Sequence, residues 1–402
     1  MIATKKVFFV LFAAFPFLPA LAAAQITAPA PISDTSKQVD TAKKSVFTLR
    51  TIGMAPVYLF EINDNAKIEA AHQFPGARPL PDSCYYPGEH HLKNIRQLTF
   101  EGVNTRPVIS PDDNYLAFQA HGEKPNSCDQ IYRMPLTGVP ASRISSGKGR
   151  ATGVAFLSGN ELLFSSTEAV NGGACPGEPK DGVWPMQKGS NLYTSDSNEK
   201  QLQPLTKDEE HFDGDASVSP NGDRILFTST RTGEAELFSM KADGSDVKQL
   251  TQGEGFNGDA AFSPSGNEIV LCESHPKGRT LAEYKTSLEK GYIDPAGLEI
   301  YVMNTDGTNK RPVTHLSGTC YAPHWAPDGE HIVFSSKNFL TGNATDLFMI
   351  RKDGTDLERI TFGRVFDGFA EFSRDGTKLV FCSNRNASHP NDINLFVADW
   401  VP

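Results

Sequence analysis

The sequence lacks the short motifs by which many enzymes are recognised. It contains no H-E-x-x-H metalloprotease motif, no G-x-S-x-G nucleophile elbow and no phosphate-binding P-loop. None of its six cysteines belongs to a C-x-x-C pair, which excludes a zinc ribbon and a thioredoxin-type redox motif. The sequence therefore offers no strong catalytic signal, and a non-catalytic protein is the favoured interpretation.

Basic charge and long apolar runs are also scarce. Lysine and arginine total 38 against 48 aspartate and glutamate residues, which gives a formal net charge of −10. Nucleic-acid binding depends on neutralising phosphates with basic side chains, so an acidic chain is a poor candidate for it. The one long apolar run, residues 7–21, is short and interrupted by Pro16 and Pro19. We expect neither nucleic-acid binding nor membrane insertion.

The apolar run has the features of an export signal. Lys5 and Lys6 precede it and three alanines follow it, so residues 1–24 are expected to form a signal peptide that is cut before Gln25. Residues 25–44 are rich in small and polar residues and are expected to form a flexible leader. The sequence thus predicts a periplasmic or secreted protein.

An internal repeat dominates the rest of the chain. A short apolar strand, a turn built from Pro, Asn, Asp or Gly, and a second apolar strand recur in six copies: VISPDDNYLAF (108–118), AFLSGNELLF (155–164), SVSPNGDRILF (217–227), AFSPSGNEIVL (261–271), HWAPDGEHIVF (324–334) and EFSRDGTKLVF (371–381). A third strand follows each copy, as in ELFSM (236–240), and a fourth follows most of them. The pattern predicts an all-β fold, a β-propeller of six four-stranded blades. An open array of β-sandwiches is the alternative.

Closure of the ring requires a strand from elsewhere, because the last copy ends at Trp400 without a fourth strand. PVYLFEIN (56–63) resembles a third strand and RQLTF (96–100) a fourth. We therefore expect an N-terminal extension, residues 45–96, to close the last blade of a propeller formed by residues 97–402. If residues 45–63 supply further strands, a seventh partial blade is the alternative.

The pattern L-T, a loop, F-S-P-D-G-x-x-I-x-F and then L-F-x-M-x-x-D-G-T resembles the WD40-like repeat of TolB-type propellers over residues 97–399. The resemblance implies an envelope-associated protein, involved in Tol-type transport or envelope maintenance, that binds a protein or peptide partner. TolB proteins carry an α/β domain ahead of the propeller, and the short extension here implies a stand-alone member, which we expect to be monomeric. TolB-like propellers also precede serine peptidase domains, whose G-x-S-x-G motif is missing here.

A four-stranded meander places all the long insertions on one face. These insertions are residues 119–129, 166–190, 273–297, 337–345 and 384–393. Long loops often carry binding sites, so we expect the partner on this face and at the channel mouth. In the 273–297 insertion, the spacing of Leu281, Tyr284 and Leu288 predicts a helix. The helix either covers the channel mouth or packs against a blade.

The connections into the first strands of the blades carry the candidate site residues. They read VNTRP (103–107), FDGDA (212–216), FNGDA (256–260) and FDGFA (366–370). Aligned, they predict two rings at the channel rim, which are Asn104, Asp213, Asn257 and Asp367 in one and Arg106, Asp215 and Asp259 in the other. The carboxylates of Asp213, Asp215, Asp259 and Asp367 could bind calcium or a cationic group of the partner. Ordinary turn formation would select the same residue types.

Cysteines and histidines give the remaining predictions. Cys128 and Cys175 lie in the same loop of adjacent blades and are expected to form a disulfide. Cys272 and Cys382 are expected to be buried thiols, whereas Cys84 and Cys320 are not assigned.

The adjacent pair His90 and His91 is a candidate for binding a transition metal. Adjacent histidines usually point in different directions, which weakens this candidate. Propeller-type lyases of acidic oligosaccharides use histidines on a TolB-like scaffold. The alternative function is therefore a metal-assisted saccharide lyase or hydrolase.

Overall fold

The computed structural model forms two compact units, Met1–Glu69 and Ala70–Pro402. It describes residues 49–52, 55–58, 77–121, 128–138, 140–157, 159, 161–177, 182–195, 202–337 and 344–402. The expected signal peptide (1–24) and leader (25–44) lie outside the described residues. In the first unit, β1 (Leu49–Ile52) and β2 (Ala55–Tyr58) pair with each other as an antiparallel hairpin.

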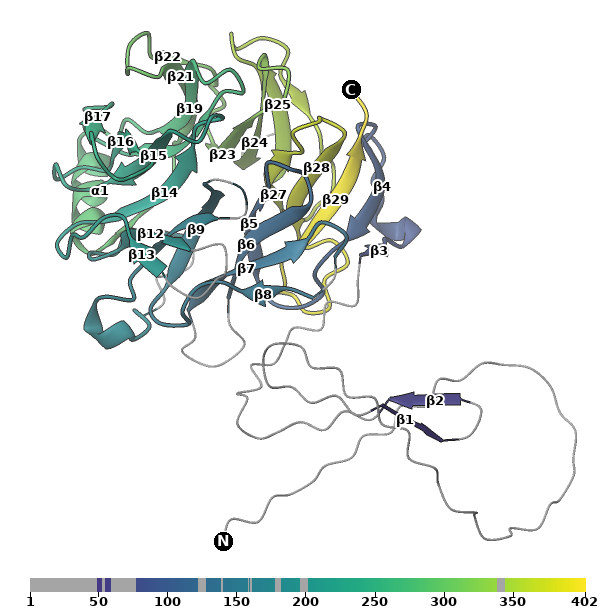
Figure 1. Cartoon of the computed structure of the whole chain (residues 1–402). Coiled ribbons are helices and arrows are strands. Elements are labelled where there is room, and N and C mark those ends of the chain that lie inside the picture. The colour runs from purple at the N-terminus through teal and green to yellow at the C-terminus, as the bar shows by residue number, and fades with distance from the viewer. Residues whose placement is uncertain are drawn as a thin grey trace, which may run out of the picture. The chain divides into compact units, whose positions relative to one another are not determined.

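Six antiparallel sheets of the second unit are the blades, and each contains a meander of four strands (Figure 1). The first strands are β5 (Asn104–Ile109), β9 (Ala151–Phe156), β14 (Asp213–Val218), β18 (Asn257–Phe262), β23 (Thr319–Trp325) and β27 (Asp367–Phe372). The second strands are β6 (Tyr115–His121), β10 (Leu162–Ser166), β15 (Arg224–Ser229), β19 (Glu268–Glu273), β24 (His331–Lys337) and β28 (Lys378–Ser383). The third strands are β7 (Asp129–Pro135), β12 (Asn191–Ser195), β16 (Glu236–Lys241), β21 (Glu299–Asn304), β25 (Asp346–Arg351) and β29 (Asn394–Trp400). The fourth strands are β8 (Ser142–Arg143), β13 (Leu202–Pro204), β17 (Lys248–Gln249), β22 (Arg311–Pro312), β26 (Glu358–Arg359) and β4 (Leu92–Gln97).

The first strands form the inner wall of a closed ring. Each contacts the first strand of the next blade, from β5 through β9, β14, β18, β23 and β27 and back to β5. The predicted six-bladed β-propeller is therefore confirmed.

The hydrophobic core lies between the blades and within their second and third strands. In three blades, stacked phenylalanine pairs join these strands, with centroids 5.7 to 5.9 Å apart: Phe227 with Phe238, Phe334 with Phe348, and Phe381 with Phe396. Such pairs add roughly 0.5–1.5 kcal/mol to the free energy of burying their area. The repeated sequence pattern thus specifies equivalent core contacts in these blades as well as equivalent turns.

The last blade is closed by the N-terminal extension, as predicted. β4 pairs with β29, with Gln97 opposite Phe396 and Leu92 opposite Trp400. The strand begins at Leu92, four residues before the predicted RQLTF segment (96–100). A fifth strand, β3 (Arg78–Pro79), pairs with β4, and the 3-10 helix η1 (Asp82–Cys84) lies between them in the chain. Residues 59–63 of the other expected strand lie outside the described residues.

The predicted helix is α1 (Arg279–Glu289), which buries Tyr284. Lys285 of this helix forms an ion pair with Glu234, in a connection within the third blade, and another with Glu254, in the connection between the third and fourth blades. The helix therefore packs on the blades. After the helix, β20 (Tyr292–Ile293) pairs with β11 (Trp184–Pro185), which lies in another long insertion after the 3-10 helix η2 (Asn171–Gly173). No helix within the described ranges combines the length and the apolar character needed to span a bilayer.

The predicted disulfide between Cys128 and Cys175 is present, with a Cα–Cα distance of 5.7 Å. The other cysteines, Cys84, Cys272, Cys320 and Cys382, are buried free thiols. The bridge joins the long-loop ends of the first two blades, and it spans 47 positions of the chain.

Removing this bridge with Cys128→Ala and Cys175→Ala is expected to lower the free energy of unfolding by about 2–4 kcal/mol, because the unfolded chain regains the entropy of an open loop. Equilibrium unfolding in urea measures the loss. Reductant should lower the free energy of unfolding of the wild type to that of the double variant, and it should leave the value of the double variant unchanged. Equal stability of the two oxidised proteins would show that the bridge does not stabilise the fold.

Candidate functional site

Each first strand of the propeller contains a β-bulge at the same place. The pairing register with the second strand shifts within every one of them, for example between Gly214 and Ser217 in β14. One residue at each bulge has a positive φ, and these six residues form what we call the channel ring: Arg106 (51°), Gly153 (62°), Asp215 (47°), Asp259 (49°), Ala322 (50°) and Phe369 (53°). This conformation costs a non-glycine residue roughly 1–2 kcal/mol. Because it recurs in all six blades, we interpret the bulge as a structural feature that changes the direction of one residue per blade.

Three charged members of the channel ring meet across the centre of the propeller. Nη1 of Arg106 lies 3.4 Å from Oδ1 of Asp215 and 3.2 Å from Oδ1 of Asp259. Their strands belong to the first, third and fourth blades, so these contacts span the channel. Oδ2 of Asp259 also accepts the backbone N–H of Ala322 at 2.9 Å. The second ring predicted from the sequence is therefore brought together in one cluster.

Burial and the neighbouring charges shift the pKa values of this cluster in opposite directions. Burial lowers the pKa of Arg106, but Asp215 and Asp259 raise it by more, so the guanidinium stays charged. Burial raises the pKa of Asp215; Arg106 lowers it by less, so the net shift is upward. The side chain of Arg106 is 21% exposed to solvent. The cluster is therefore charged and largely enclosed, with part of the Arg106 side chain exposed to solvent.

Aromatic side chains surround the guanidinium of Arg106. Its Cζ lies 5.3 Å from the ring centroid of Phe369 and 5.9 Å from that of Trp184, within the range of cation–π attraction. The ring of Tyr321 stands edge-on to both, at 5.5 Å from Phe369 and 5.8 Å from Trp184. Because Trp184 belongs to β11, the long insertions supply part of the cover of the channel mouth.

A second level of the channel holds a pair of ionisable side chains. Nδ1 of His324 lies 3.9 Å from Oε2 of Glu371, and Oε1 of Glu371 accepts the backbone N–H of Ile109 at 3.2 Å. Burial raises the pKa of Glu371 to about 8, and the N–H of Ile109 offsets only part of this. Burial also lowers the pKa of His324. At neutral pH Glu371 therefore keeps its proton and His324 is uncharged.

The first ring predicted from the sequence does not face the channel. Its members are buried, at most 2% exposed: Asn104, Asp213, Asn257 and Asp367. Asp213 is paired with Arg231 at 2.9 Å and Asp367 with Arg385 at 3.0 Å, so each carboxylate binds the connection that follows the second strand of its own blade. Calcium at the rim stays a prediction; two of its four candidate carboxylates, Asp213 and Asp367, are fully buried and paired with Arg231 and Arg385.

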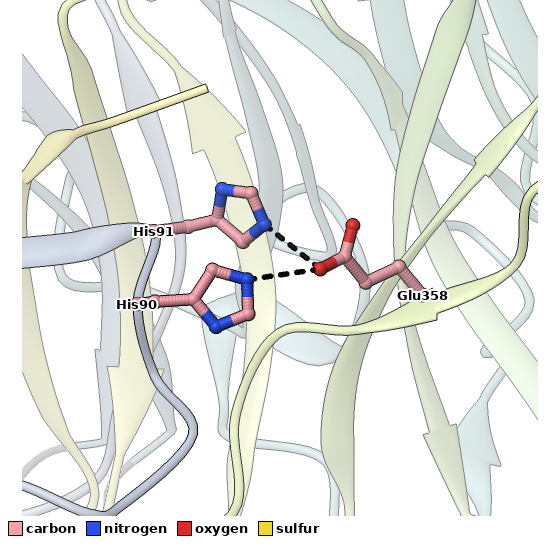
Figure 2. Close-up of side chains that lie close together, drawn as sticks. All are labelled: His90, His91 and Glu358. Carbon is pink, nitrogen blue, oxygen red and sulfur yellow. Dashed lines mark hydrogen bonds and ion pairs between the residues drawn. The ribbon is translucent and has the colours of Figure 1, made fainter.

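The adjacent histidines lie at the outer edge of the propeller and converge on one carboxylate (Figure 2). Nε2 of His90 is 3.3 Å and Nε2 of His91 is 2.9 Å from Oε1 of Glu358. The two rings share a direction because they lie in the turn before β4; within a strand, successive side chains would point to opposite faces. Over the described ranges this is the one group of three His, Cys, Asp or Glu side chains whose ligand atoms lie within 4.8 Å of one another.

Sequence reasoning missed several residues of these sites. Phe369 had a usable signal, because it stands in FDGFA (366–370) at the position that Asp215 and Asp259 occupy in their own copies. Trp184 and Glu358 had none, since each lies in a segment whose path depends on distant parts of the chain. His324 and Glu371 had a usable signal, because each is the first residue of its repeat copy, HWAPDGEHIVF (324–334) and EFSRDGTKLVF (371–381).

Comparison with known proteins gives partial matches. No family model matches the sequence. A TolB homologue of Chlorobium luteolum is 29% identical over 164 residues, which are 41% of this chain and 32% of that protein. The matches span about a third of the length of the curated relatives.

Two solved structures are similar in fold. TolB from Acinetobacter baumannii is 19% identical, with a TM-score of 0.47, covering 74% of this chain and 70% of that one. A gluconolactonase from Xanthomonas campestris is 12% identical, with a TM-score of 0.51, covering 81% of this chain and 95% of that one. At these identities, neither likeness concerns more than the fold.

A closed ring of six four-stranded blades around a channel lined by bulged strands defines a β-propeller. Its repeat is similar to that of TolB-type propellers, and about two fifths of the chain matches the Chlorobium homologue.

Proposed function

We propose that this chain is an exported, monomeric TolB-like propeller that binds a protein or peptide partner in the cell envelope, at the channel mouth on its long-loop face. The observation that carries the proposal is the Arg106 cluster beneath its aromatic cover. Two carboxylates face one guanidinium group, so acidic groups outnumber basic ones in the cluster, and aromatic rings stand beside it. The mouth therefore suits a cationic group of the partner, such as a lysine side chain or an amino terminus.

Export is supported independently of the channel. Disulfides persist in oxidising compartments, so the Cys128–Cys175 bridge suits a periplasmic or secreted protein. The basic residues and the apolar run at the N-terminus agree with this location. The envelope-associated role rests on analogy with TolB-like proteins.

Asp215→Asn and Trp184→Ala are expected to remove partner capture. The first variant takes one negative charge from the cluster, and the second takes away an aromatic face. Immobilised wild type should retain envelope proteins from a detergent extract that each variant fails to retain, as identified by mass spectrometry. A photo-crosslinking residue placed at position 184 should link to the same proteins.

Asp306→Asn is the matched control, since this exposed aspartate lies in the short turn after β21, at the other end of the blades. Capture by the control should equal that of the wild type, and circular dichroism should show all variants folded. Undiminished capture by both channel variants would contradict the proposed site.

The alternative, a metal-assisted saccharide lyase or hydrolase, gains no support from the channel. Its candidate ligands, His90 and His91, lie next to the outermost strands, whereas the channel is lined by the innermost ones. No observation places a substrate-sized site beside them.

A further inference from the structure

Both imidazole rings of the histidine pair form hydrogen bonds with backbone carbonyl groups through Nδ1. Nδ1 of His91 lies 2.6 Å from the carbonyl oxygen of Val401, and Nδ1 of His90 lies 2.8 Å from that of Gly88. A carbonyl oxygen only accepts hydrogen bonds, so Nδ1 carries a proton in each ring. In the neutral imidazole, Nε2 of each ring is then left with a free lone pair.

The two lone pairs point at a third acceptor, the carboxylate of Glu358 (Figure 2). Acceptors that face one another at 2.9 and 3.3 Å repel unless positive charge lies between them. A proton on Nε2 supplies that charge in the His91–Glu358 hydrogen bond, and a metal ion in its place supplies it to both rings at once. In a tetrahedral site each ligand atom lies about 2.0–2.2 Å from zinc, which puts the ligand atoms about 3.3–3.6 Å from one another. The separation at His90, 3.3 Å, falls in this range, and that at His91, 2.9 Å, is shorter.

We propose that His90, His91 and Glu358 form a binding site for a divalent transition-metal ion of the zinc type. Two imidazole nitrogens and one carboxylate oxygen suit this class of ion. The carbonyl groups behind the rings act as the outer partners that orient metal-binding histidines. The ring of His91 is also stacked on Trp400, with centroids 4.8 Å apart.

The surroundings leave room for entry and for water in the remaining coordination positions. The side chain of His90 is 65% exposed and that of Glu358 is 39% exposed, whereas that of His91 is only 9% exposed. The buried ring thus provides a fixed ligand, and the two exposed side chains can close on an ion that arrives from solvent.

The site joins three separate parts of the chain at the closure of the ring. His90 and His91 directly precede the closing strand β4, and Val401 directly follows its partner β29. Glu358 begins β26 of the fifth blade. A bound ion would therefore clamp the closing strand to the neighbouring blade and stabilise the folded state, because the unfolded chain does not hold these ligands together.

Titration with Zn²⁺ or Co²⁺ tests the site directly. The untagged protein, stripped of metal by dialysis against a chelator, should bind one equivalent, measured by calorimetry. Co²⁺ should give the visible absorption bands of a low-coordinate centre, and either ion should raise the melting temperature. His90→Ala and Glu358→Gln should each weaken binding by at least roughly 10- to 100-fold and remove the thermal shift.

His389→Ala is the matched control, since His389 is an exposed histidine paired with one carboxylate, that of Asp392, at 3.2 Å. It should bind the ion as the wild type does. Both site variants alter exposed side chains, so they should fold, which circular dichroism checks. The proposal is overturned if the wild type binds no ion, or binds it no more tightly than His90→Ala. It concerns the outer edge of the propeller, so it stands or falls separately from partner capture at the channel.

Discussion

Replacing Arg385 with methionine is expected to lower the free energy of unfolding by about 3–5 kcal/mol, because it leaves two buried carboxylates without a counter-charge. The side chain is fully buried. Its Nη1 and Nη2 atoms each lie 3.1 Å from an oxygen of Glu89, and Nη2 lies 3.0 Å from Oδ1 of Asp367. Methionine fills much of the volume but supplies no charge. Equilibrium urea unfolding at neutral pH measures the loss.

Two controls separate the charge effect from packing. Adding Glu89→Gln and Asp367→Asn to Arg385→Met should recover much of the loss, because the uncompensated charges disappear. Arg279→Met breaks a solvent-exposed pair with Glu283 and should unfold like the wild type. If Arg385→Met is no less stable than Arg279→Met, the buried network does not hold the closing segment in place.

The stability of Glu371→Gln is expected to exceed that of the wild type increasingly as the pH rises from about 5 to about 9. The pKa of Glu371 is about 8 in the folded protein because of burial, against 4.5 for the free side chain. A raised pKa means that its stabilisation is complete below the unfolded pKa and is lost as the pH rises through the folded one. The expected difference is a few kcal/mol, at about 1.4 kcal/mol for each unit of pKa difference.

Unfolding of both proteins in urea across this pH range tests the prediction. Asp346, whose pKa is raised to about 7 by burial, changes the stability of both proteins alike, so the difference between them reports on Glu371. Glu210→Gln, at an exposed position, should follow the wild type at every pH. A constant difference between Glu371→Gln and the wild type would show that this carboxyl group ionises as it does in solvent.

The features that could be predicted are those with a local signature. Hairpins such as β14–β15 follow from apolar strands around a turn that contains Gly222, whose φ is positive as expected. The helix α1 follows from the spacing of its apolar residues. The Cys128–Cys175 bridge follows from the equivalence of two loops in neighbouring repeats. In each case the residues that decide the structure lie within one repeat or in equivalent places of adjacent repeats.

The sequence by itself determined the four-stranded repeat, the order of its strands, the face that carries the long loops and the need for a closing strand, and it left six or seven blades open. Only the tertiary structure decided which polar residues face the channel and which are buried. Arg106 meets Asp259 across 153 positions of the chain, and His91 meets Glu358 across 267. Strand and turn preferences depend on neighbours in sequence, whereas these contacts depend on the closure of the ring and on a bulge that re-aims one residue per strand. The repeat pattern therefore placed both predicted rings at the channel rim and did not show which of them is buried.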